Sequence, residues 1–259
     1  MINFINVKKK YDNSIVLKNI NFSLPRTGLV IIEGPSGCGK TTLLNLLSGL
    51  INFEGDITVD GHHINLMSQS QMDEFRLKKY GFIFQDFKLF GMTVRENILM
   101  GREYENDGEL VREALKKADV LERIEAMDDG IDTVMTKEFD EDGCVLSGGE
   151  SQKVAVARTF LKEAPMKIFD EPSSALDPIA EYELFDSIIG EGTDHTMLFI
   201  SHRLSSVKNC DKVFMLEKGT LIEEGTHREL MEKNGSYAAM YRKQAMNYLA
   251  IENEEEVMA

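Results

Sequence analysis

A glycine-rich octapeptide near the start of the chain restricts the choice of fold more than any other segment. It reads Gly34-Pro35-Ser36-Gly37-Cys38-Gly39-Lys40-Thr41 and satisfies the pattern G-x-x-x-x-G-K-[ST]. An apolar stretch, 29–32, precedes it, and a helix-forming stretch, 42–50, follows it. In that context the pattern predicts a loop whose backbone N–H groups surround a phosphate at a helix N-terminus. The alternative, a glycine-rich turn without a ligand, does not explain the strand and helix on either side.

The residues of this loop have separate expected roles. Lys40 is placed to reach the terminal phosphates of the ligand, and the Thr41 hydroxyl is placed to bind Mg²⁺. Thr42 begins the expected helix and completes the expected binding segment. Cys38 lies beside Lys40 and a helix N-terminus, so we expect its thiolate to be favoured and its alkylation to block ligand binding.

Strands and helices alternate along most of the sequence, which is typical of an α/β domain with a largely parallel central sheet. The expected strands are 2–11, 16–24, 28–33, 55–61, 81–85, 166–170 and 196–201, with a hairpin over 213–223. The expected helices are 42–50, 70–80, 109–118, 150–163, 179–189 and 226–248. Residues 93–127 are helical in pattern and strongly charged, with Asn106 or Asp107 placed as a cap, so a mostly helical subdomain is expected there.

Composition excludes several classes of protein. The 259 residues include 29 basic and 44 acidic side chains, and the net charge of −15 argues against a general nucleic-acid binder. Three separated cysteines, Cys38, Cys144 and Cys210, form no Cys-x-x-Cys pair and indicate a reducing cytosol. No apolar run approaches the roughly 18 residues of a membrane-spanning helix, and residues 1–10 lack the core of a signal peptide. We therefore expect a chain that neither crosses a membrane nor is secreted.

A second half of the expected site follows the apolar strand 166–170. This strand ends in Asp170, and Glu171 comes directly after it. Asp170 is placed to hold Mg²⁺, directly or through water, and Glu171 to polarise an attacking water as a general base. On its own such a string is more often a plain strand end, but a phosphate-binding loop upstream favours the catalytic interpretation.

The segment Leu146-Ser147-Gly148-Gly149-Glu150 lies ahead of the acidic strand and opens a predicted helix. Ser147 is a suitable N-cap, and the N–H groups that follow it can meet an anion. Here the sequence resembles the ATP-binding cassette (ABC) ATPases, whose signature motif has this form and usually ends in Gln where Glu150 stands. The resemblance implies a P-loop NTPase with a mostly parallel central sheet, an N-terminal antiparallel β subdomain and an inserted α-helical signature subdomain at about 86–160.

Four further positions match the family's motifs. Tyr11 corresponds to the aromatic residue that stacks on adenine, although a tyrosine on an early strand can also serve only in packing. Gln85 corresponds to the loop glutamine that touches Mg²⁺ and the attacking water and meets the membrane partner. Asp177 corresponds to the D-loop residue that carries contact across the pair of cassettes, and it can also be the N-cap before Pro178. His202 ends a predicted strand, as does the switch histidine that bonds the γ-phosphate. The other histidines have no metal-ligand spacing.

The resemblance extends from about residue 2 to residue 248, with six motifs in the family's order. Residues 1–95 are most similar to stand-alone cassettes of lipoprotein-release and macrolide-efflux transporters. From residue 93 onward the chain is more similar to cassettes of multidrug and peptide exporters. We therefore expect a single ATPase domain over 1–250 and an acidic tail over 251–259.

The function implied by the resemblance is an ATPase that powers a transporter, with ATP and Mg²⁺ as cofactors. In this family two cassettes pack head to tail, and each ATP lies between the phosphate loop of one and the signature segment of the other. The expected partners are a second cassette, identical or different, and a separate membrane permease at the cytoplasmic face of the cell membrane. No nucleic acid is expected as a partner.

Two rival functions fit the residues less well. Family members that act on the translation machinery or on DNA usually carry two cassettes or a long coiled-coil insertion, whereas this chain has one cassette and a charge that opposes polyanions. A nucleotide-binding regulator with poor hydrolysis is disfavoured because Glu171 and His202 are both present. Transport is the best-supported expectation.

Overall fold

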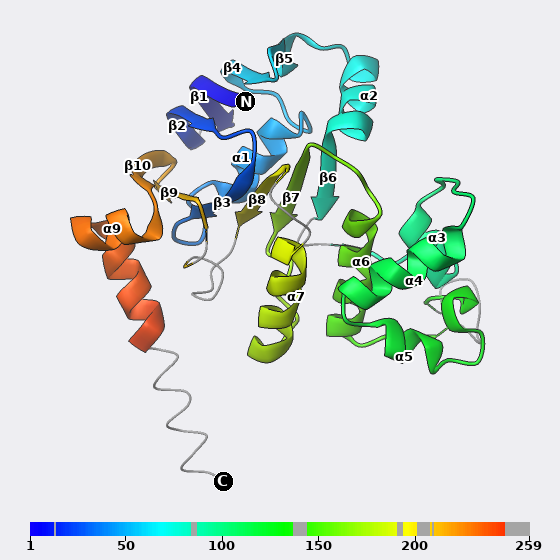
Figure 1. Cartoon of the computed structure of the whole chain (residues 1–259). Helices are drawn as coiled ribbons and strands as arrows, with labels where there is room; N and C mark the ends of the chain where they lie inside the picture. The colour runs from blue at the N-terminus through cyan, green and yellow to red at the C-terminus, as the bar shows by residue number, and fades with distance from the viewer. Residues whose placement is uncertain are drawn as a thin grey trace. The chain divides into compact units, whose positions relative to one another are not determined.

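The computed structural model describes residues 1–12, 14–83, 87–136, 144–190, 194–200, 208 and 210–246 (Figure 1). The chain divides into two compact units. The first unit comprises Met1–Lys78 together with Asp194–Ala259, and the second comprises Lys79–Thr193. The phosphate-binding loop belongs to the first unit, and the acidic strand and the signature segment belong to the second.

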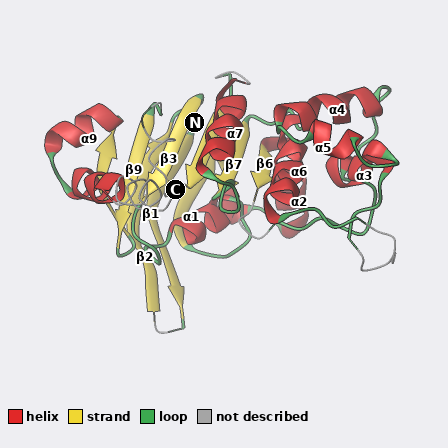
Figure 2. Ribbon diagram, turned by 90° about the horizontal axis from the view of Figure 1, so that it is seen from below, coloured by secondary structure: helices red, strands yellow, loops and turns green. Residues whose placement is uncertain are grey.

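An antiparallel sheet forms one part of the first unit, with its strands in the order β2-β1-β4-β5. These strands are β1 (Ile2–Tyr11), β2 (Ser14–Leu24), β4 (Glu54–Val59) and β5 (His62–His63). β1 and β2 form a long hairpin (Figure 2) in which Ile2 pairs with Leu24 and the rings of Phe4 and Phe22 stack with centroids 4.4 Å apart. The expected N-terminal antiparallel β subdomain is confirmed.

The second sheet of this unit contains the strand that leads into the phosphate-binding loop. β3 (Gly28–Glu33) pairs in parallel with both β8 (Thr196–Ile200) and β9 (Lys212–Glu217), and β10 (Thr220–Gly225) is antiparallel to β9. All residues of β3 and β8 are buried, as expected of strands covered on both faces. The helical segments are α1 (Lys40–Leu47), the short η1 (Ile64–Leu66) and α2 (Gln69–Lys79).

The C-terminal helix differs from the sequence prediction. The sequence predicts one helix over 226–248, but α9 (His227–Lys233) ends at Asn234, whose φ of 54° is left-handed, and a second helix covers residues 236–246. The Glu223 carboxylate accepts hydrogen bonds from the backbone N–H groups of Ser236 and Tyr237, at 2.8 and 3.0 Å. A side chain from a neighbouring strand therefore caps the second helix, and helical propensity alone does not reveal that contact.

The second unit combines two parallel strands with a cluster of helices. β6 (Tyr80–Ile83) pairs with β7 (Met166–Asp170). The helical segments are α3 (Val94–Leu99), α4 (Asp107–Lys117), α5 (Leu121–Glu125), η2 (Gly130–Asp132), α6 (Gly148–Phe160) and α7 (Pro178–Gly190). Helices α3, α4, α5 and α6 gather in one group (Figure 1) around a shared core that includes Ile98, Leu115 and Val154. The mostly helical subdomain expected over residues 93–127 is thus present.

The sequence predictions place most elements within a few residues of their observed bounds. The first helix starts at Lys40, two residues earlier than predicted, and the helix predicted over 150–163 is α6. Part of the strand predicted over 81–85 lies outside the described residues, as does the acidic tail expected over 251–259. In the part of the chain that the structure describes, no helix is long and apolar enough to cross a membrane.

Candidate functional site: a phosphate-binding loop and a capped signature helix

The loop between β3 and α1 has a buried floor and an exposed rim. Gly34, Cys38, Gly39 and Lys40 are buried, whereas residues 35–37 are exposed. Gly34 has a φ of 150°, and a Cβ there would lie 2.2 Å from the Leu216 carbonyl oxygen. Any larger side chain at this position would therefore push the loop away from β9. The glycine pattern seen in the sequence corresponds to a real steric requirement.

Lys40 lies inside this loop. The residue is only 6% exposed, and its ammonium group donates hydrogen bonds to the carbonyl oxygens of Gly34, at 2.7 Å, and Pro35, at 3.2 Å. The N-terminus of α1 carries no side-chain cap and no acidic residue in its first turn. The helix therefore presents uncapped N–H groups and a positive partial charge next to a buried lysine, a combination that suits a phosphate.

The turn between β9 and β10 supports the loop through backbone hydrogen bonds. The Gly219 N–H donates to the Cys38 carbonyl oxygen at 3.1 Å, and the Gly219 carbonyl accepts from the Lys18 N–H at 2.7 Å. A Cβ on Gly219 would lie 2.0 Å from the Val16 carbonyl oxygen. The hairpin predicted over 213–223 is confirmed, with Lys218 and Gly219 at its turn, but the sequence does not predict the contact of this turn with the phosphate-binding loop, because that contact is long-range.

The prediction that the Cys38 thiolate is favoured is wrong, whereas the effect of its alkylation stays a prediction. The residue is 5% exposed, and burial raises the pKa of the thiol above its ordinary value, more than the positive charge of Lys40 lowers it. The buried carboxylate of Glu33, which ends β3, contributes to this higher pKa. The lysine and the helix N-terminus both favour the thiolate, but desolvation of the buried thiol opposes them and decides the direction of the pKa shift.

Tyr11 and the two loop threonines lie at more exposed positions of the same unit. Tyr11 is the last residue of β1, is 44% exposed and has the Lys9 ammonium group 4.7 Å from the centre of its ring. Thr41 is exposed and Thr42 is partly exposed in the first turn of α1. These positions are compatible with an adenine contact and a metal contact, which remain predictions.

The acidic strand of the second unit ends as the sequence predicts. β7 is buried throughout, and Asp170, its last residue, is 3% exposed. Glu171 has a φ of 49°, a left-handed conformation that non-glycine residues adopt rarely and that is often found at functional sites. Asp170 would offer carboxylate oxygens, the ligand type that Mg²⁺ prefers.

Gln152 is a residue of this region that the sequence reasoning missed. It is fully buried on α6, and its amide group donates to the Glu171 carbonyl oxygen and the Ser174 hydroxyl, both at 3.3 Å. Its side-chain oxygen accepts from the Ala175 N–H at 2.9 Å. One glutamine thus connects the signature helix to the segment after Glu171. A polar residue among the apolar positions of α6 was the only sequence signal for it.

The signature segment forms the N-terminus of α6. Ser147 is the N-cap and takes part in a capping box: its hydroxyl accepts from the Glu150 N–H at 3.2 Å, and the Glu150 carboxylate accepts from the Ser147 N–H at 2.8 Å. Ser147 and Gly148 are exposed. A Cβ on Gly149 would lie 3.1 Å from the Leu176 side chain, so a larger residue there would crowd the following segment. The predicted N-cap is confirmed.

Asp177 also caps a helix. Its carboxylate accepts from the N–H groups of Ile179 and Ala180, at 3.0 and 3.1 Å, at the start of α7. The hydrogen bond from Ala180 is the main reason why the pKa of Asp177 is lowered. The capping role considered for Asp177 is therefore present, and its role across a pair of cassettes remains a prediction. Gln85 and His202 lie outside the described residues.

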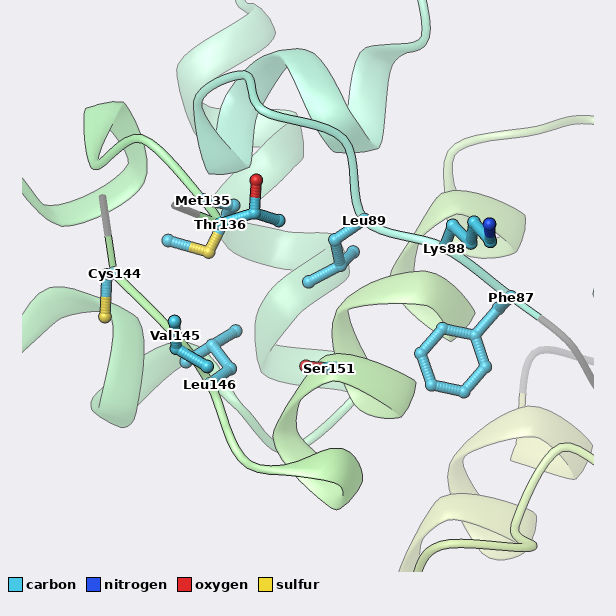
Figure 3. A pocket seen from close by; sticks show the side chains of 9 residues that line it. All are labelled: Phe87, Lys88, Leu89, Met135, Thr136, Cys144, Val145, Leu146 and Ser151. Atoms are coloured by element: carbon cyan, nitrogen blue, oxygen red, sulfur yellow. The ribbon is translucent and has the colours of Figure 1, made fainter. Parts of the chain in front are cut away.

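A pocket of about 330 Å³ lies in the second unit (Figure 3). It is lined by Phe87, Lys88, Leu89, Met135, Thr136, Cys144, Val145, Leu146 and Ser151. Segment 87–89 forms one side, and segment 144–146, directly ahead of the signature, forms another (Figure 3). Val145 is 67% exposed, so the pocket opens beside an apolar side chain that is accessible to a partner.

The segment leading from this pocket to α3 is held by two polar side chains. Asn97 is fully buried, accepts from the Phe90 N–H at 2.8 Å, and donates to the carbonyl oxygens of Phe90, Met92 and Thr93 at 3.0–3.1 Å. Arg158 donates to the carbonyl oxygens of Lys88 and Asn97, both at 2.8 Å. Burial lowers the pKa of Arg158 to about 10.

The loop, the acidic strand and the capped helix together define a nucleotide-binding protein of the P-loop class. A sequence model of the family described as ABC transporter matches residues 17–174, more than half of the chain. The chain belongs to this family, and the part of its relatives that it matches is the ATP-binding cassette.

Individual relatives agree with this assignment. An "ATP-dependent lipid A-core flippase" of Desulfotalea psychrophila is 36% identical over 244 residues, which cover 94% of this chain and 41% of the flippase. A "Putative multidrug export ATP-binding/permease protein" of Staphylococcus aureus is 39% identical over 228 residues, 87% of this chain and 38% of that protein. The solved structure of a bacterial Atm1-family ABC exporter with ATP bound matches with a TM-score of 0.83 and 34% identity, covering 94% of this chain and 42% of the exporter chain. The chain thus spans about two fifths of the length of these proteins.

Proposed function

We propose that this cassette hydrolyses ATP to drive an ABC exporter, with residues 1–250 acting as a single ATPase domain. The observation that carries the proposal is the buried Lys40 inside a glycine-rich loop, beside an uncapped helix N-terminus. The relatives named above include a flippase and an exporter, which supports export as the direction of transport. Because these relatives are membrane transporters, we propose that the cassette acts at the cytoplasmic face of a membrane.

In the proposed ATP complex, the phosphates lie in the loop formed by Gly34 to Thr42. The ammonium group of Lys40 exchanges its carbonyl partners for the terminal phosphates, and the first-turn N–H groups of α1 bond the remaining oxygens. Tyr11 stacks on the adenine ring. Mg²⁺, held by oxygen atoms of Thr41, Gln85 and Asp170, would neutralise charge on the phosphates.

Hydrolysis needs a positioned water and stabilised charge more than it needs covalent chemistry. Glu171 is proposed to accept a proton from the attacking water, and its unusual backbone conformation, held in part by Gln152, sets where its carboxylate stands. His202 is proposed to donate a hydrogen bond to the γ-phosphate.

The signature segment is proposed to complete the ATP site of a second cassette, which is either another copy of this chain or a different one. Ser147, Gly148 and Gly149 begin α6, and the first two are exposed, as a contact with a neighbouring molecule requires. Asp177, at the start of α7, is proposed to carry contact between the two sites. ATP binding then draws the two cassettes together, and hydrolysis releases them.

The partner in the membrane is proposed to be a permease that seats a cytoplasmic segment in the pocket of Figure 3. Support comes from the apolar lining and from the exposed Val145 at its edge. A separate permease is the expectation from sequence. The Staphylococcus aureus relative joins the ATP-binding and permease functions in one name, so a permease joined to the cassette in one protein is the alternative arrangement.

The experiment that tests the proposal uses Glu171→Gln, which removes the general base but keeps the shape of the side chain. We expect this variant to be monomeric without nucleotide and to pair when ATP and Mg²⁺ are added, because it binds ATP but does not hydrolyse it. Light scattering coupled to size-exclusion chromatography measures the change in mass. Glu171→Gln combined with Lys40→Ala is the matched control, and it is expected to stay monomeric.

If Glu171→Gln without the second substitution remains monomeric at high protein concentration with ATP and Mg²⁺, this result would count against the head-to-tail pair. Affinity capture of the ATP-bound variant from detergent-solubilised source cells then tests the membrane partner. A polytopic membrane protein among the captured material supports the transporter proposal, whereas exclusive capture of ribosomal or DNA-bound proteins contradicts it.

A further inference from the structure

The N-terminus of α6 carries a negative charge where the proposed function needs an anion to bind. Glu150 is the third residue of the helix, and its carboxylate folds back to accept the Ser147 N–H at 2.8 Å. The carboxylate is thereby fixed next to the exposed Ser147 and Gly148. A full negative charge so close to the helix end opposes the partial positive charge that would attract a phosphate.

Arg123 supplies a compensating charge. Its Nε donates to the second carboxylate oxygen of Glu150 at 3.0 Å, so the two oxygens of Glu150 have different partners, the Ser147 N–H and Arg123. The hydrogen bond from Ser147 contributes most to lowering the pKa of Glu150, and Arg123 adds to it. Glu150 is therefore ionised at neutral pH and is neutralised locally by a residue of another helix, α5.

Stability alone does not account well for this ion pair. The side chains of Arg123 and Glu150 are 46% and 30% exposed, and ion pairs at such positions contribute little to folding. A neighbouring pair, Arg112 with Glu125 at 2.7 Å, has similar exposure but involves no residue of the signature segment. The two pairs differ mainly in their position relative to the start of α6.

We propose that Arg123 is a positioning residue for ATP-driven pairing: it screens the charge of Glu150, so that the N-terminus of α6 can accept the triphosphate of a second cassette. The inference rests on the proposed function, because it assumes that the signature segment meets ATP in trans. Arg123 lies outside the family's motifs, and its proposed electrostatic role acts through Glu150.

The test compares the loss of Arg123 in two backgrounds. All variants carry Glu171→Gln, and the ATP concentration that gives half-maximal pairing is measured by light scattering. Arg123→Ala is expected to raise this concentration about two- to fivefold, the range that one partly exposed charge pair can supply. In a Glu150→Gln background, where no charge needs screening, the same substitution is expected to change it less than about twofold.

Three further measurements separate screening from a simple structural role. Arg123→Lys keeps the charge and is expected to restore pairing to within about twofold of the reference. The penalty of Arg123→Ala is expected to shrink between low salt and about 0.5 M NaCl, because salt screens exposed charges. Arg112→Ala, the matched control, is expected to leave pairing unchanged.

The outcomes distinguish failure of the Arg123 screening role from failure of ATP-driven pairing itself. If Arg123→Ala weakens pairing equally with and without Glu150→Gln, the screening role is overturned while the ATP-driven pair stands. The screening role is also overturned if the weaker pairing of Arg123→Ala is independent of salt, or if Arg123→Lys does not restore pairing. Failure of the Glu171→Gln reference itself to pair with ATP would overturn the proposed function and the inference together.

Discussion

The ammonium group of Lys40 lies inside the loop that it is proposed to serve. Two backbone carbonyl oxygens accept its hydrogen bonds, and the side chain is almost completely buried. A buried charge with hydrogen-bond partners keeps its position with little loss of side-chain entropy on binding. The lysine is thus prepared for an anion before the anion arrives.

Replacing Lys40 by Ala should therefore abolish stabilisation by nucleotide. Saturating ATP at about 100 times its Kd stabilises a folded protein by about 2.7 kcal/mol, and this increment should disappear when the phosphate contact is lost. Thermal unfolding with and without ATP and Mg²⁺ measures it, each variant being compared with its own nucleotide-free form. Lys78→Ala, an exposed lysine paired with Glu74, is the control and should keep the full shift. An unchanged shift for Lys40→Ala would contradict the phosphate role.

Burial also makes one cysteine a source of alkaline instability. Burial raises the pKa of Cys210 from 9.0 to about 12. Between these values the native state keeps the proton and the unfolded state has released it, so the free energy of unfolding falls as pH rises. Cys210→Ala should make this fall shallower by about 1.4 kcal/mol per pH unit between about pH 9 and 12.

Urea unfolding at several alkaline pH values tests this prediction for Cys210. Val213→Ala is the control, because it removes buried volume from the neighbouring strand β9 without removing a titrating group. It should lower stability at every pH and leave the slope unchanged. The same slope in the wild type and in Cys210→Ala would show that the thiol does not titrate differently in the two states.

At the scale of single elements, regular periodicity in the sequence predicts where a helix or strand lies. Features that depend on long-range contacts cannot be predicted in this way. β3 and β7 have the predicted bounds, because their residues are mostly apolar, and β1 also has its predicted bounds although its pairing with β2 is irregular. The C-terminal helix was predicted as one piece, because the capping of its second half by Glu223 depends on a strand outside the helix. The fold class therefore follows from local sequence pattern, whereas the break in the C-terminal helix follows from a tertiary contact.

The same distinction holds for the site. The residues of the phosphate-binding loop and of the signature helix were found because their chemistry requires fixed spacings. The sequence does not predict the roles of Gln152 and Glu33 or the contact of Gly219 with the loop, because each depends on contacts made by the fold, and no spacing rule describes them. Desolvation of Cys38 was missed for the same reason, since burial depends on the whole unit.

The segment before α3 should depend strongly on Asn97. Replacing Asn97 by Ala leaves several backbone groups of residues 90–93 without their partner, at a cost of about 2–4 kcal/mol in the free energy of unfolding. Urea unfolding measures the loss. Asn106→Ala is the matched control, since Asn106 is the N-cap of α4 but makes no side-chain capping bond, and it should cost far less. If Asn97→Ala and Asn106→Ala lower the free energy of unfolding equally, the hydrogen bonds of Asn97 do not stabilise the protein more than an ordinary cap position does.

For the whole molecule, a net charge of −15 sets how two copies approach each other. Like net charges repel, and this repulsion is screened by salt. If the partner is a second copy of this chain, ATP-driven pairing of the Glu171→Gln variant should strengthen about two- to fivefold when NaCl is raised from about 20 mM to about 150 mM. Analytical ultracentrifugation at fixed ATP and Mg²⁺ measures this. Weaker pairing over that range would show that local attraction between opposite charges outweighs the net repulsion.

The turn at Gly219 has a practical consequence for anyone who wishes to insert a reporter into this chain. A two-residue hairpin turn is normally a first choice for such an insertion. Here the turn bonds both Cys38 and Lys18, so an inserted tag would disturb the floor of the nucleotide site. The turn at Gly61, where a Cβ would meet nothing within 4 Å, is a safer place for a fluorescent label.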